Sequence, residues 1–565
     1  MKPDRMKQKG QPKAYSDIEA VRLVWLAAFV SVFSFLFYQR HGDILLSGDA
    51  VAHINIARRV FDSQTPGLLQ LGTVWLPLPH LLILPFIVPM RLWQTGTGGS
   101  IPSMAAYILS ALGIFRLVRA VLAHSVPDAT AKSTAWAAAI LYVANPNLIY
   151  MQATAMGESL YLAFFIWALV YFAEFVSSQV VNASLTKSSL CVAAACLTRY
   201  DGWFLAAVLI IVASIVYIAR GRSSERSAQS PANPRVALIK FILIACAAPV
   251  LWLAYNAIVY RNPLEFANGP YSAKAIEQKT ATVNPAKGNL YAAGSYFLKA
   301  AELNIGEAKW QQRLWLILAI AGTIFAAFTR ARLALLLWIP LLFYALCVAY
   351  GSIPIFVPSW WPFSMYNVRY GLELLPAFAV FVPVAIAFLV RSAARFPELK
   401  ISSELWQGAT AFIIVIALGA ANYAPIWRAD PICYREAYNN NRGRIALDDQ
   451  LAQWFTSFPP DSTYLMYLGE QSGAFEQAGI PLRRVINEGN QRVWIRPYDP
   501  QGLWERALAD PAAYANYIIG FEGGPVWAAA KAHHLTALVE IHTTGQPPAA
   551  IFLGAKPQGK QNTRQ

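Results

Sequence analysis

The sequence predicts a multi-pass α-helical membrane protein with a smaller soluble α/β domain at its C-terminus. Of its 565 residues, 56% are hydrophobic and only 14% are charged, which is too apolar for a soluble enzyme of this length. The apolar residues form long runs as far as residue 425, and from about Trp427 the runs shorten and polar turns appear. This change in composition separates a membrane domain at 21–426 from a C-terminal domain at 427–565.

About eleven apolar segments approach the length of roughly twenty residues that a bilayer requires. Their limits are near 21–38, 101–122, 134–151, 158–176, 188–198, 202–219, 237–258, 313–329, 333–350, 372–390 and 405–425. The run at 74–90 is also apolar, but prolines interrupt it. We therefore expect a re-entrant or interfacial piece there, inside an outer loop at 39–100.

The charges between these segments indicate the orientation of the chain. Lys and Arg number 46 against 31 for Asp and Glu, and basic residues follow every even-numbered segment. These residues are Arg116, Arg119, Lys132, Lys187, Arg220, Arg222, Arg226, Arg235, Arg330, Arg332, Arg391, Arg395 and Lys400. Because cytoplasmic loops retain Lys and Arg, the tail at 1–20 should be cytoplasmic. An odd number of spans in a cell (inner) membrane then places 427–565 in the periplasm or outside the cell.

The first apolar segment follows a basic tail but is long enough to span and lacks a small-residue cleavage motif, so we expect an uncleaved helix. No basic run is interleaved with aromatic residues, and nucleic acid is therefore not an expected partner. Four of the five cysteines fall in apolar segments, so no disulfide framework is implied.

The C-terminal domain alternates predicted strands with predicted helices. Strands are expected at 463–468, 517–521, 537–542 and 549–553, and helices at 448–455, 472–478 and 525–532. This pattern is typical of a small α/β domain. Its glycines Gly469, Gly473 and Gly479 do not have the spacing of a dinucleotide-binding fingerprint, and we assign the domain no chemistry.

A short predicted helix in the first outer loop carries the main candidate site. Asp49 and His53 are four residues apart, so both project from one side of this helix. A carboxylate at the mouth of a membrane cavity can act as general base on an acceptor hydroxyl or amine. The alternative is that Asp49 only caps the helix, which leaves His53 and the neighbouring cation Arg58 unexplained. A separate apolar stripe, formed by Ala50, Ile54, Ala57 and Phe61, suits a helix that lies in the membrane interface.

Two arginines lie at the predicted outer ends of spans. Arg199 is in a tight turn after the fifth segment, and Arg369, next to Tyr370, opens the tenth. Guanidinium groups match phosphate oxygens, so both are candidates for binding a phosphate. Arg199 could instead snorkel or pair with Asp201, and the aromatic residues around Arg369 also fit an ordinary interfacial belt.

Three further residues are weaker candidates for supporting roles. Glu158 opens the fourth segment, where a carboxylate is also simply favourable at a helix N-terminus. Lys274 lies in a long outer loop at 259–312 and either reaches a phosphate or is solvated. His80 could join His53 and Asp49 in holding a divalent metal, but no spacing rule supports such a site, and we assign no metal ligands.

With these residues in place, the chain resembles the GT-C superfamily of integral membrane glycosyltransferases, and within it the branch of protein O-mannosyltransferases and aminoarabinose transferases. Three features carry the resemblance. They are the acidic motif after the first span, the Pro- and Trp-rich remainder of that loop, and a many-span core with an outer C-terminal domain. It implies a polyprenyl-phosphate-linked sugar as donor, reaction at the outer face, and Asp49 at the reaction centre, with inversion at the sugar carbon. Many members have two adjacent acids where this chain has Asp49 and Ala50. Glu158 or Asp43 could supply the second carboxylate.

The resemblance leaves the acceptor open among protein, lipid and glycan, with membrane lipids around the helices. A lipid or solute transporter of the cell envelope is the main alternative function. Transporters tend to show repeats, broken helices and ionisable residues near the bilayer midplane. The charges of interest here lie instead at outer helix ends, which favours interfacial chemistry. A purely structural protein would leave the first-loop motif unexplained.

Overall fold

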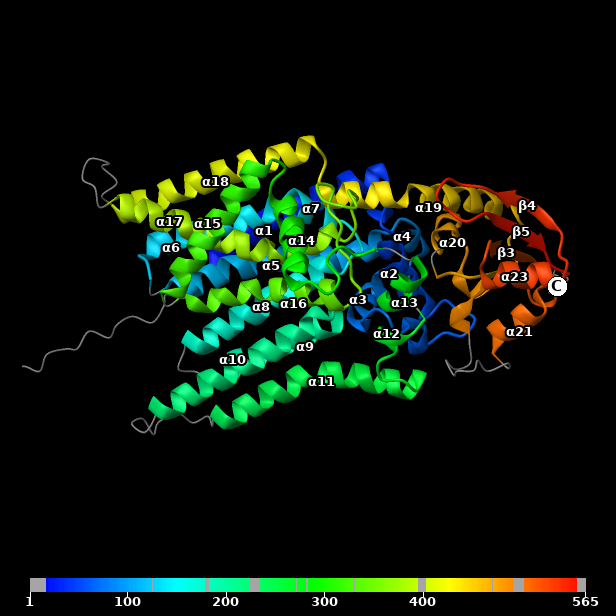
Figure 1. Cartoon of the computed structure of the whole chain (residues 1–565), viewed down its shortest axis with the longest axis horizontal. Helices are drawn as coiled ribbons and strands as arrows, with labels where there is room; N and C mark the ends of the chain where they lie inside the picture. Colours follow the sequence, from blue (N-terminus) through cyan, green and yellow to red (C-terminus); the bar gives the residue numbers. More distant parts are fainter. Residues whose placement is uncertain are drawn as a thin grey trace, which may run out of the picture.

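The computed structural model is a helical bundle with a small sheet at one end (Figure 1). It describes residues 17–123, 125–177, 182–223, 234–270, 272–280, 283–329, 331–394, 403–469, 471–490 and 502–555. Most of the predicted cytoplasmic tail and the basic residues Arg226, Arg330, Arg395 and Lys400 lie outside the described residues.

Every predicted span corresponds to helical structure. The helices of the bundle are α1 (Asp17–His41), α5 (Thr97–Leu122), α6 (Asp128–Val143), α7 (Pro146–Gln152), α8 (Glu158–Ser177), α9 (Asn182–Thr198), α10 (Asp201–Ser223), α11 (Pro234–Tyr260), α14 (Leu290–Ile305), α15 (Lys309–Ala327), α16 (Ile339–Tyr350), α17 (Leu375–Ala393) and α18 (Glu404–Arg428). The 3-10 helices η4 (Arg332–Trp338) and η5 (Val368–Leu374) lead directly into α16 and α17.

The number of spans differs from the prediction. Among the described residues, eight helical stretches are long and apolar enough to cross a membrane, against about eleven expected. The predicted span at 134–151 breaks into α6 and α7 ahead of Pro146, because proline disfavours helix in the residue before it. Two further predicted spans are not among the eight helical stretches. One is α9, which has 17 residues, and the other is α15, whose first turns carry Lys309 and Arg313.

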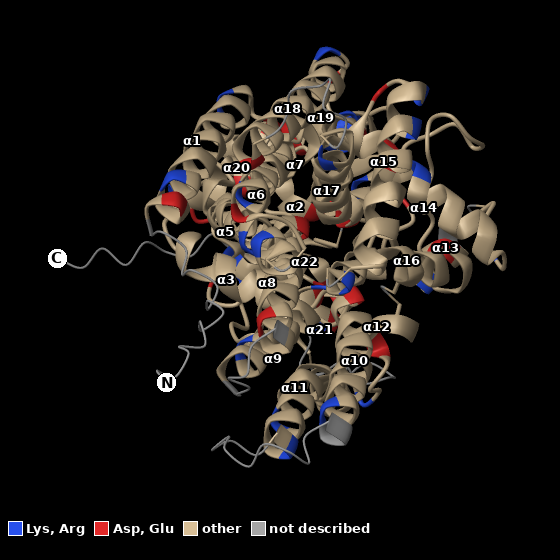
Figure 2. Ribbon diagram, turned by 90° about the vertical axis from the view of Figure 1, so that its left-hand side faces the viewer, with Lys and Arg blue, Asp and Glu red and all other residues tan. Residues whose placement is uncertain are grey.

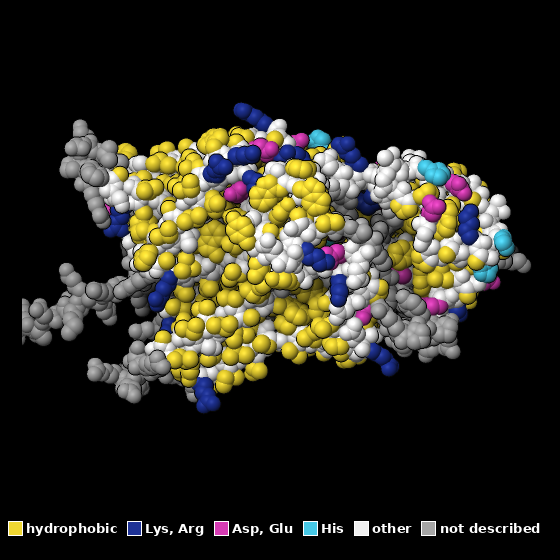
Figure 3. All heavy atoms as spheres, viewed as in Figure 1, with side chains coloured by type: hydrophobic (Ala, Val, Ile, Leu, Met, Phe, Trp, Pro, Cys, Tyr) yellow, Lys and Arg dark blue, Asp and Glu magenta, His cyan; other side chains and the backbone are white. Residues whose placement is uncertain are grey.

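The face of the bundle drawn in Figure 3 is apolar over most of its length. Large hydrophobic side chains stand exposed on α1, α11 and α18, among them Trp25, Phe29, Leu251, Ile258 and Ile413. Exposed apolar surface on this scale marks contact with another apolar phase, and with helices of spanning length that phase is lipid. The chain is therefore a multi-pass membrane protein.

The C-terminal region folds around a five-stranded sheet of order β2-β1-β3-β5-β4. Its strands are β1 (Tyr464–Met466), β2 (Val485–Ile486), β3 (Tyr517–Phe521), β4 (Ala537–Ile541) and β5 (Ala549–Leu553), and its helices are α20 (Gly473–Ala478), α21 (Leu503–Ala509), α22 (Pro511–Tyr514) and α23 (Pro525–Ala532). β1 pairs in parallel with β2 and β3, whereas β5 runs antiparallel to β3 and β4. The fold class predicted from the sequence, a helical membrane protein with a C-terminal α/β unit, is confirmed.

One long helix, α19 (Ile432–Ser457), joins the bundle to the sheet (Figure 1). It packs against α7, η5 and α2 near its start and against α20 of the sheet region. The change from apolar to polar sequence near Trp427 coincides with the break between α18, which ends at Arg428, and α19, which begins at Ile432. The separate helix expected at 448–455 is the last part of α19.

The first outer loop contains α2 (Gly48–Arg59), α3 (Pro77–Ile83) and α4 (Met90–Gln94), and the later loop contains α12 (Glu265–Asn268) and α13 (Ala273–Thr280). As expected, the proline-interrupted run forms only a short apolar helix at Pro77–Phe86. The apolar stripe expected to face the membrane interface is buried in the protein at three of its four positions, and only Phe61 is exposed. Ala50, Ile54 and Ala57 are fully buried, and Asn55 on a different side of the helix contacts Glu476 of α20. A stripe pattern cannot reveal that a distant domain will cover the polar side.

Candidate active site

Asp49 in the first turn of α2 is hydrogen-bonded to Arg369 of η5. The Nη2 atom of Arg369 donates to Oδ2 of Asp49 at 2.6 Å. The same guanidinium donates from Nε to Oε1 of Glu158 at 3.2 Å and from Nη1 to Oε1 of Glu436 at 3.2 Å. Arg369 is thus surrounded by three carboxylates from α2, α8 and α19, elements far apart in the sequence.

The second arginine, Arg199, shares a partner with the first. Its Nη1 atom donates to the same Oε1 atom of Glu158 at 3.1 Å, and its Nη2 donates to the hydroxyl of Tyr344 at 2.7 Å. Its Nε also donates to Asp201 at 3.3 Å, so the pairing considered from the sequence exists within the larger cluster. The ring of Tyr370 lies 4.9 Å from the Arg199 Cζ atom and 5.2 Å from that of Arg369, within cation–π range of both.

Acidic groups outnumber basic ones in this cluster. Its carboxylates are Asp49, Glu158, Asp201, Glu373 and Glu436, and its guanidinium groups are Arg199 and Arg369. Both oxygens of Glu373 are buried without a hydrogen-bond partner among the described residues, although one lies 3.7 Å from Arg199. Several acidic positions lie near α2 in the middle of the bundle when it is viewed end-on (Figure 2). An anionic ligand at Arg369 would therefore compete with carboxylates already there.

Exposure separates Asp49 from the other acids. The side chain of Asp49 is 40% exposed, whereas those of Glu158 and Glu373 are 2% and 0% exposed. Asp49 is therefore the carboxylate of the cluster that an incoming molecule meets first.

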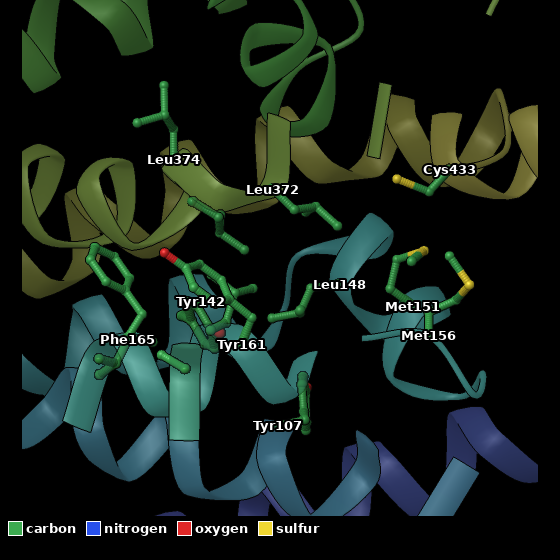
Figure 4. Close-up of a cluster of buried hydrophobic side chains, with 14 of the residues drawn as sticks. Tyr107, Tyr142, Leu148, Met151, Met156, Tyr161, Phe165, Leu372, Leu374 and Cys433 are labelled. Carbon is green, nitrogen blue, oxygen red and sulfur yellow. The ribbon is translucent and has the colours of Figure 1, made fainter. Parts of the chain in front are cut away.

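Asp49 and Arg369 line a hollow of about 220 Å³. Its polar wall also includes Glu436 of α19 and the amide side chains of Asn367, Asn440 and Asn441. Met151, Met156 and Cys433 line its apolar side, where their side chains gather at the edge of the buried hydrophobic cluster (Figure 4). The hollow thus offers one polar wall and one apolar wall beside the exposed carboxylate.

His53 and His80 form a buried pair one helical turn from Asp49. The Nδ1 atom of His53 lies 2.9 Å from Nε2 of His80, so one ring donates to the other. Burial lowers the pKa of His53, and burial together with the neighbouring His53 lowers the pKa of His80 well below its ordinary value. Both rings are therefore neutral at neutral pH.

The histidine pair does not fit a metal site as arranged. Nδ1 of His53 and Nε2 of His80 are hydrogen-bonded to each other, so no metal ion fits between them. No group of three His, Cys, Asp or Glu side chains that could hold a metal ion is present among the described residues. We derive no chemical step through a metal.

Three other residues singled out from the sequence lie apart from the cluster. Arg58 points away from it, pairing with Asp62 at 2.8 Å and donating to the backbone oxygen of Ile87 at 2.6 Å. Lys274 is exposed on α13 and makes no hydrogen bond or ion pair with any described residue. Asp43 does not line the hollow, and its backbone oxygen accepts from the hydroxyl of Tyr150 at 3.3 Å.

The sequence interpretation missed Glu436 and Tyr344. Glu436 lies in a polar stretch that we had assigned to the soluble domain, where one more acidic residue carries no signal. Tyr344 lies within an apolar span, where an aromatic residue is normally a packing residue. Glu373 did carry a usable signal, because an ionisable side chain inside a predicted span is expected to have a functional or paired role.

Neither a protein-family model nor a curated protein sequence matches the chain. Solved structures do match. ArnT from Cupriavidus metallidurans in the apo state aligns with a TM-score of 0.54 at 13% identity, covering 96% of this chain and 100% of ArnT. The structure of the same enzyme bound to undecaprenyl phosphate aligns with a TM-score of 0.51 at 12% identity, covering 96% and 99%. At this identity the likeness concerns the fold alone, and the chain shares the overall fold of ArnT along almost its whole length.

Proposed function

We propose that this protein is a membrane glycosyltransferase that moves a sugar from a polyprenyl-phosphate-linked donor to an acceptor at the outer face of the membrane. The observation that carries the proposal is the hydrogen bond of 2.6 Å between Asp49 and Arg369 on the wall of the hollow. It puts an exposed carboxylate and a guanidinium, the two groups that such a transfer needs, beside one cavity. The shared fold with ArnT, of which one structure contains undecaprenyl phosphate, supports the choice of donor class.

Arg369 binds the donor phosphate in this proposal. A guanidinium presents paired N–H groups that match two phosphate oxygens. Nε and Nη1 of Arg369 bind the buried Glu158 and Glu436, whereas Nη2 binds the exposed Asp49, so Nη2 is the donor that an incoming phosphate takes over. Arg199 supports this site through Glu158, which both arginines contact, and Tyr370 packs beside both guanidinium groups.

Phosphate binding at Arg369 releases Asp49 for the acceptor. Asp49 takes the proton of the acceptor hydroxyl or amine while the acceptor atom attacks the sugar carbon. The bond between that carbon and the phosphate oxygen breaks, and its electron pair leaves on the polyprenyl phosphate, where Arg369 stabilises the added charge. One direct displacement inverts the sugar carbon. His53, one turn away and neutral, lies behind Asp49 and contributes no competing positive charge.

The apolar surface of the bundle suits the lipid part of such a donor. A polyprenyl chain remains in the bilayer and presents its phosphate at headgroup depth, so no nucleotide-binding fold is needed. The face of the bundle drawn in Figure 3 is largely apolar, and the hollow is lined by α2, α7 and the first turns of α19, the helix that leads to the sheet. The acceptor is a molecule with a free hydroxyl or amine that reaches this end.

The test uses the full-length protein in nanodiscs with polyprenyl-phosphate sugars extracted from the source membranes. Release of free polyprenyl phosphate and the mass gain of the acceptor are followed by mass spectrometry. We expect both signals with the wild type and neither with Asp49→Asn. In sealed proteoliposomes, movement of the intact lipid-linked sugar across the bilayer without cleavage would instead support the transporter alternative.

A further inference from the structure

We infer that α19 is a positioning element that fixes both members of the Asp49–Arg369 pair, with Glu436 and Asn441 as its positioning residues. The inference rests on the proposed function, in which this pair performs the chemistry. It assigns a role to a helix that the sequence places outside the membrane core.

Glu436 holds the backbone that presents Arg369. Its Oε1 atom accepts from the backbone N–H of Asn367 at 2.8 Å, and its Oε2 accepts from that of Val368 at 2.8 Å. Oε1 also accepts from the Arg369 side chain at 3.2 Å. Two successive backbone N–H groups pointing at one anion form a concave anion-binding turn. Glu436 is the built-in anion of this turn, and it is only 5% exposed.

The turn held by Glu436 is a strained one. Asn367 has a φ of +57°, in the left-handed region that residues other than glycine adopt at some cost. Such a conformation persists only where its surroundings stabilise it, and the carboxylate of Glu436 contacts the N–H groups on both sides of the bend. Without this carboxylate, η5 can relax and Arg369 loses its fixed direction.

Asn441 holds the start of the helix that carries Asp49. The Oδ1 atom of Asn441 accepts from the backbone N–H of Gly48 at 3.1 Å, while Ser47 at the N-cap position makes no capping bond through its side chain. The first N–H groups of a helix lack partners within it, so Asn441 caps α2 from another element. Arg444 adds a second contact there, donating to the backbone oxygen of Leu46 at 2.9 Å.

The two contacts lie on one continuous helix, five residues apart. Five residues of α-helix span about 7.5 Å, so the helix fixes the distance between Glu436, which holds Arg369, and Asn441, which holds the start of α2. The separation of Asp49 and Arg369 therefore does not depend on their mutual hydrogen bond alone. When Arg369 exchanges Asp49 for a phosphate, both groups stay in place, which is the preorganisation that transfer chemistry requires.

The test compares Glu436→Gln and Asn441→Ala in the full-length protein in nanodiscs. Asp449→Asn and Asn439→Ala are matched controls, because both residues are exposed on the same helix. Amide hydrogen exchange needs no substrate. We expect exchange at 367–368 to accelerate at least about tenfold in Glu436→Gln, and exchange at the start of α2 to do so in Asn441→Ala, with neither change in the controls. Asn441→Asp keeps the accepting oxygen and should restore slow exchange.

Transfer kinetics give the second readout. We expect kcat to fall about ten- to hundredfold in Glu436→Gln and Asn441→Ala, with a KM for the donor within about threefold of wild type and an unchanged pH profile. Normal exchange in both segments, or accelerated exchange with normal kcat, would overturn the inference. A wild type that transfers no sugar contradicts the proposed function instead, and the exchange measurement still decides whether α19 fixes the pair.

Discussion

Arg369 and Asp49 are 320 residues apart in the sequence and are joined by a hydrogen bond of 2.6 Å in the structure. The carboxylate of Asp49 occupies the Nη2 donor of Arg369, and the guanidinium in turn occupies one of the two carboxylate oxygens. In the proposed function a lipid-linked phosphate takes the place of Asp49 at this donor and frees the carboxylate for the acceptor.

Replacing Asp49 with Asn should nearly abolish transfer. The amide retains the size of the side chain but cannot take the acceptor proton, and general-base catalysis contributes about 10² to 10⁴ in rate. Initial rates of polyprenyl phosphate release would be compared for wild type, Asp49→Asn and Asp49→Glu at equal protein. A rate for Asp49→Asn within about threefold of wild type would exclude Asp49 as the base.

Replacing Arg369 with Lys should raise the KM for the donor and lower kcat together. Lysine keeps the positive charge but cannot contact Asp49, Glu158 and Glu436 in three directions at once. The expected loss in kcat/KM is about 10- to 100-fold, which corresponds to the one or two charge-assisted hydrogen bonds lost. Arg442→Lys is the matched control, because Arg442 is exposed and contacts the ring of Tyr438. Equal effects of the two substitutions would contradict a direct role for Arg369.

Replacing Arg58 with Met should reduce stability far more than catalysis. Arg58 is buried with Asp62 and ties α2 to the backbone at Ile87, and its loss leaves the carboxylate of Asp62 buried without its nearest cation. Breaking a buried pair in this way costs about 3–5 kcal/mol. Thermal unfolding in detergent would report the loss. The kcat of the folded fraction should remain near that of wild type, and a selective fall in kcat would place Arg58 back in the reaction.

The buried pair of His53 and His80 should make stability fall at acidic pH. Burial lowers the pKa of His53 from 6.5, and burial with the adjacent His53 lowers that of His80 further. Between these lowered values and about pH 6.5 the unfolded chain binds protons that the folded chain does not, so the free energy of unfolding decreases as pH falls through this range. Unfolding temperatures measured between about pH 8 and about pH 5 should show this loss, and His80→Asn should reduce its slope.

The exposed His533 provides the control for this dependence. His533→Asn removes a histidine without touching the buried pair, so its pH slope should match that of wild type. Equal slopes for His80→Asn and wild type would show that other groups cause the acid sensitivity.

Most of the cluster could be predicted from the sequence, because charged residues at the outer ends of apolar segments are few. Glu158, Arg199 and Arg369 each begin or precede a helix of the bundle, and Asp49 follows the end of α1 by a few residues. Helices that cross together bring such ends to one depth. Tyr370 follows from its place beside Arg369. The alternation of predicted strands and predicted helices in the last hundred or so residues likewise indicated the sheet.

The remaining features depend on contacts that a single segment does not encode. Arg58 shares a short helix with Asp49, but its direction is decided by Asp62 one turn later and by carbonyl groups some thirty residues away. The burial of α2 depends on α20, and the role of Glu436 depends on a bend at Asn367. Periodicity reports the faces of one helix and not the element that will cover them.

The continuity of α19 also decides how the molecule can be divided. A truncation at residue 427 would keep nearly all of the apolar helices. It would remove Asn441, the partner of Gly48, and Glu436, the partner of Asn367 and Val368. The sheet region is therefore unsuited to being exchanged as a module between related chains unless the first turns of α19 stay with the membrane part. A chimera joined after Asp448 preserves these partners, and one joined before Ile432 loses them.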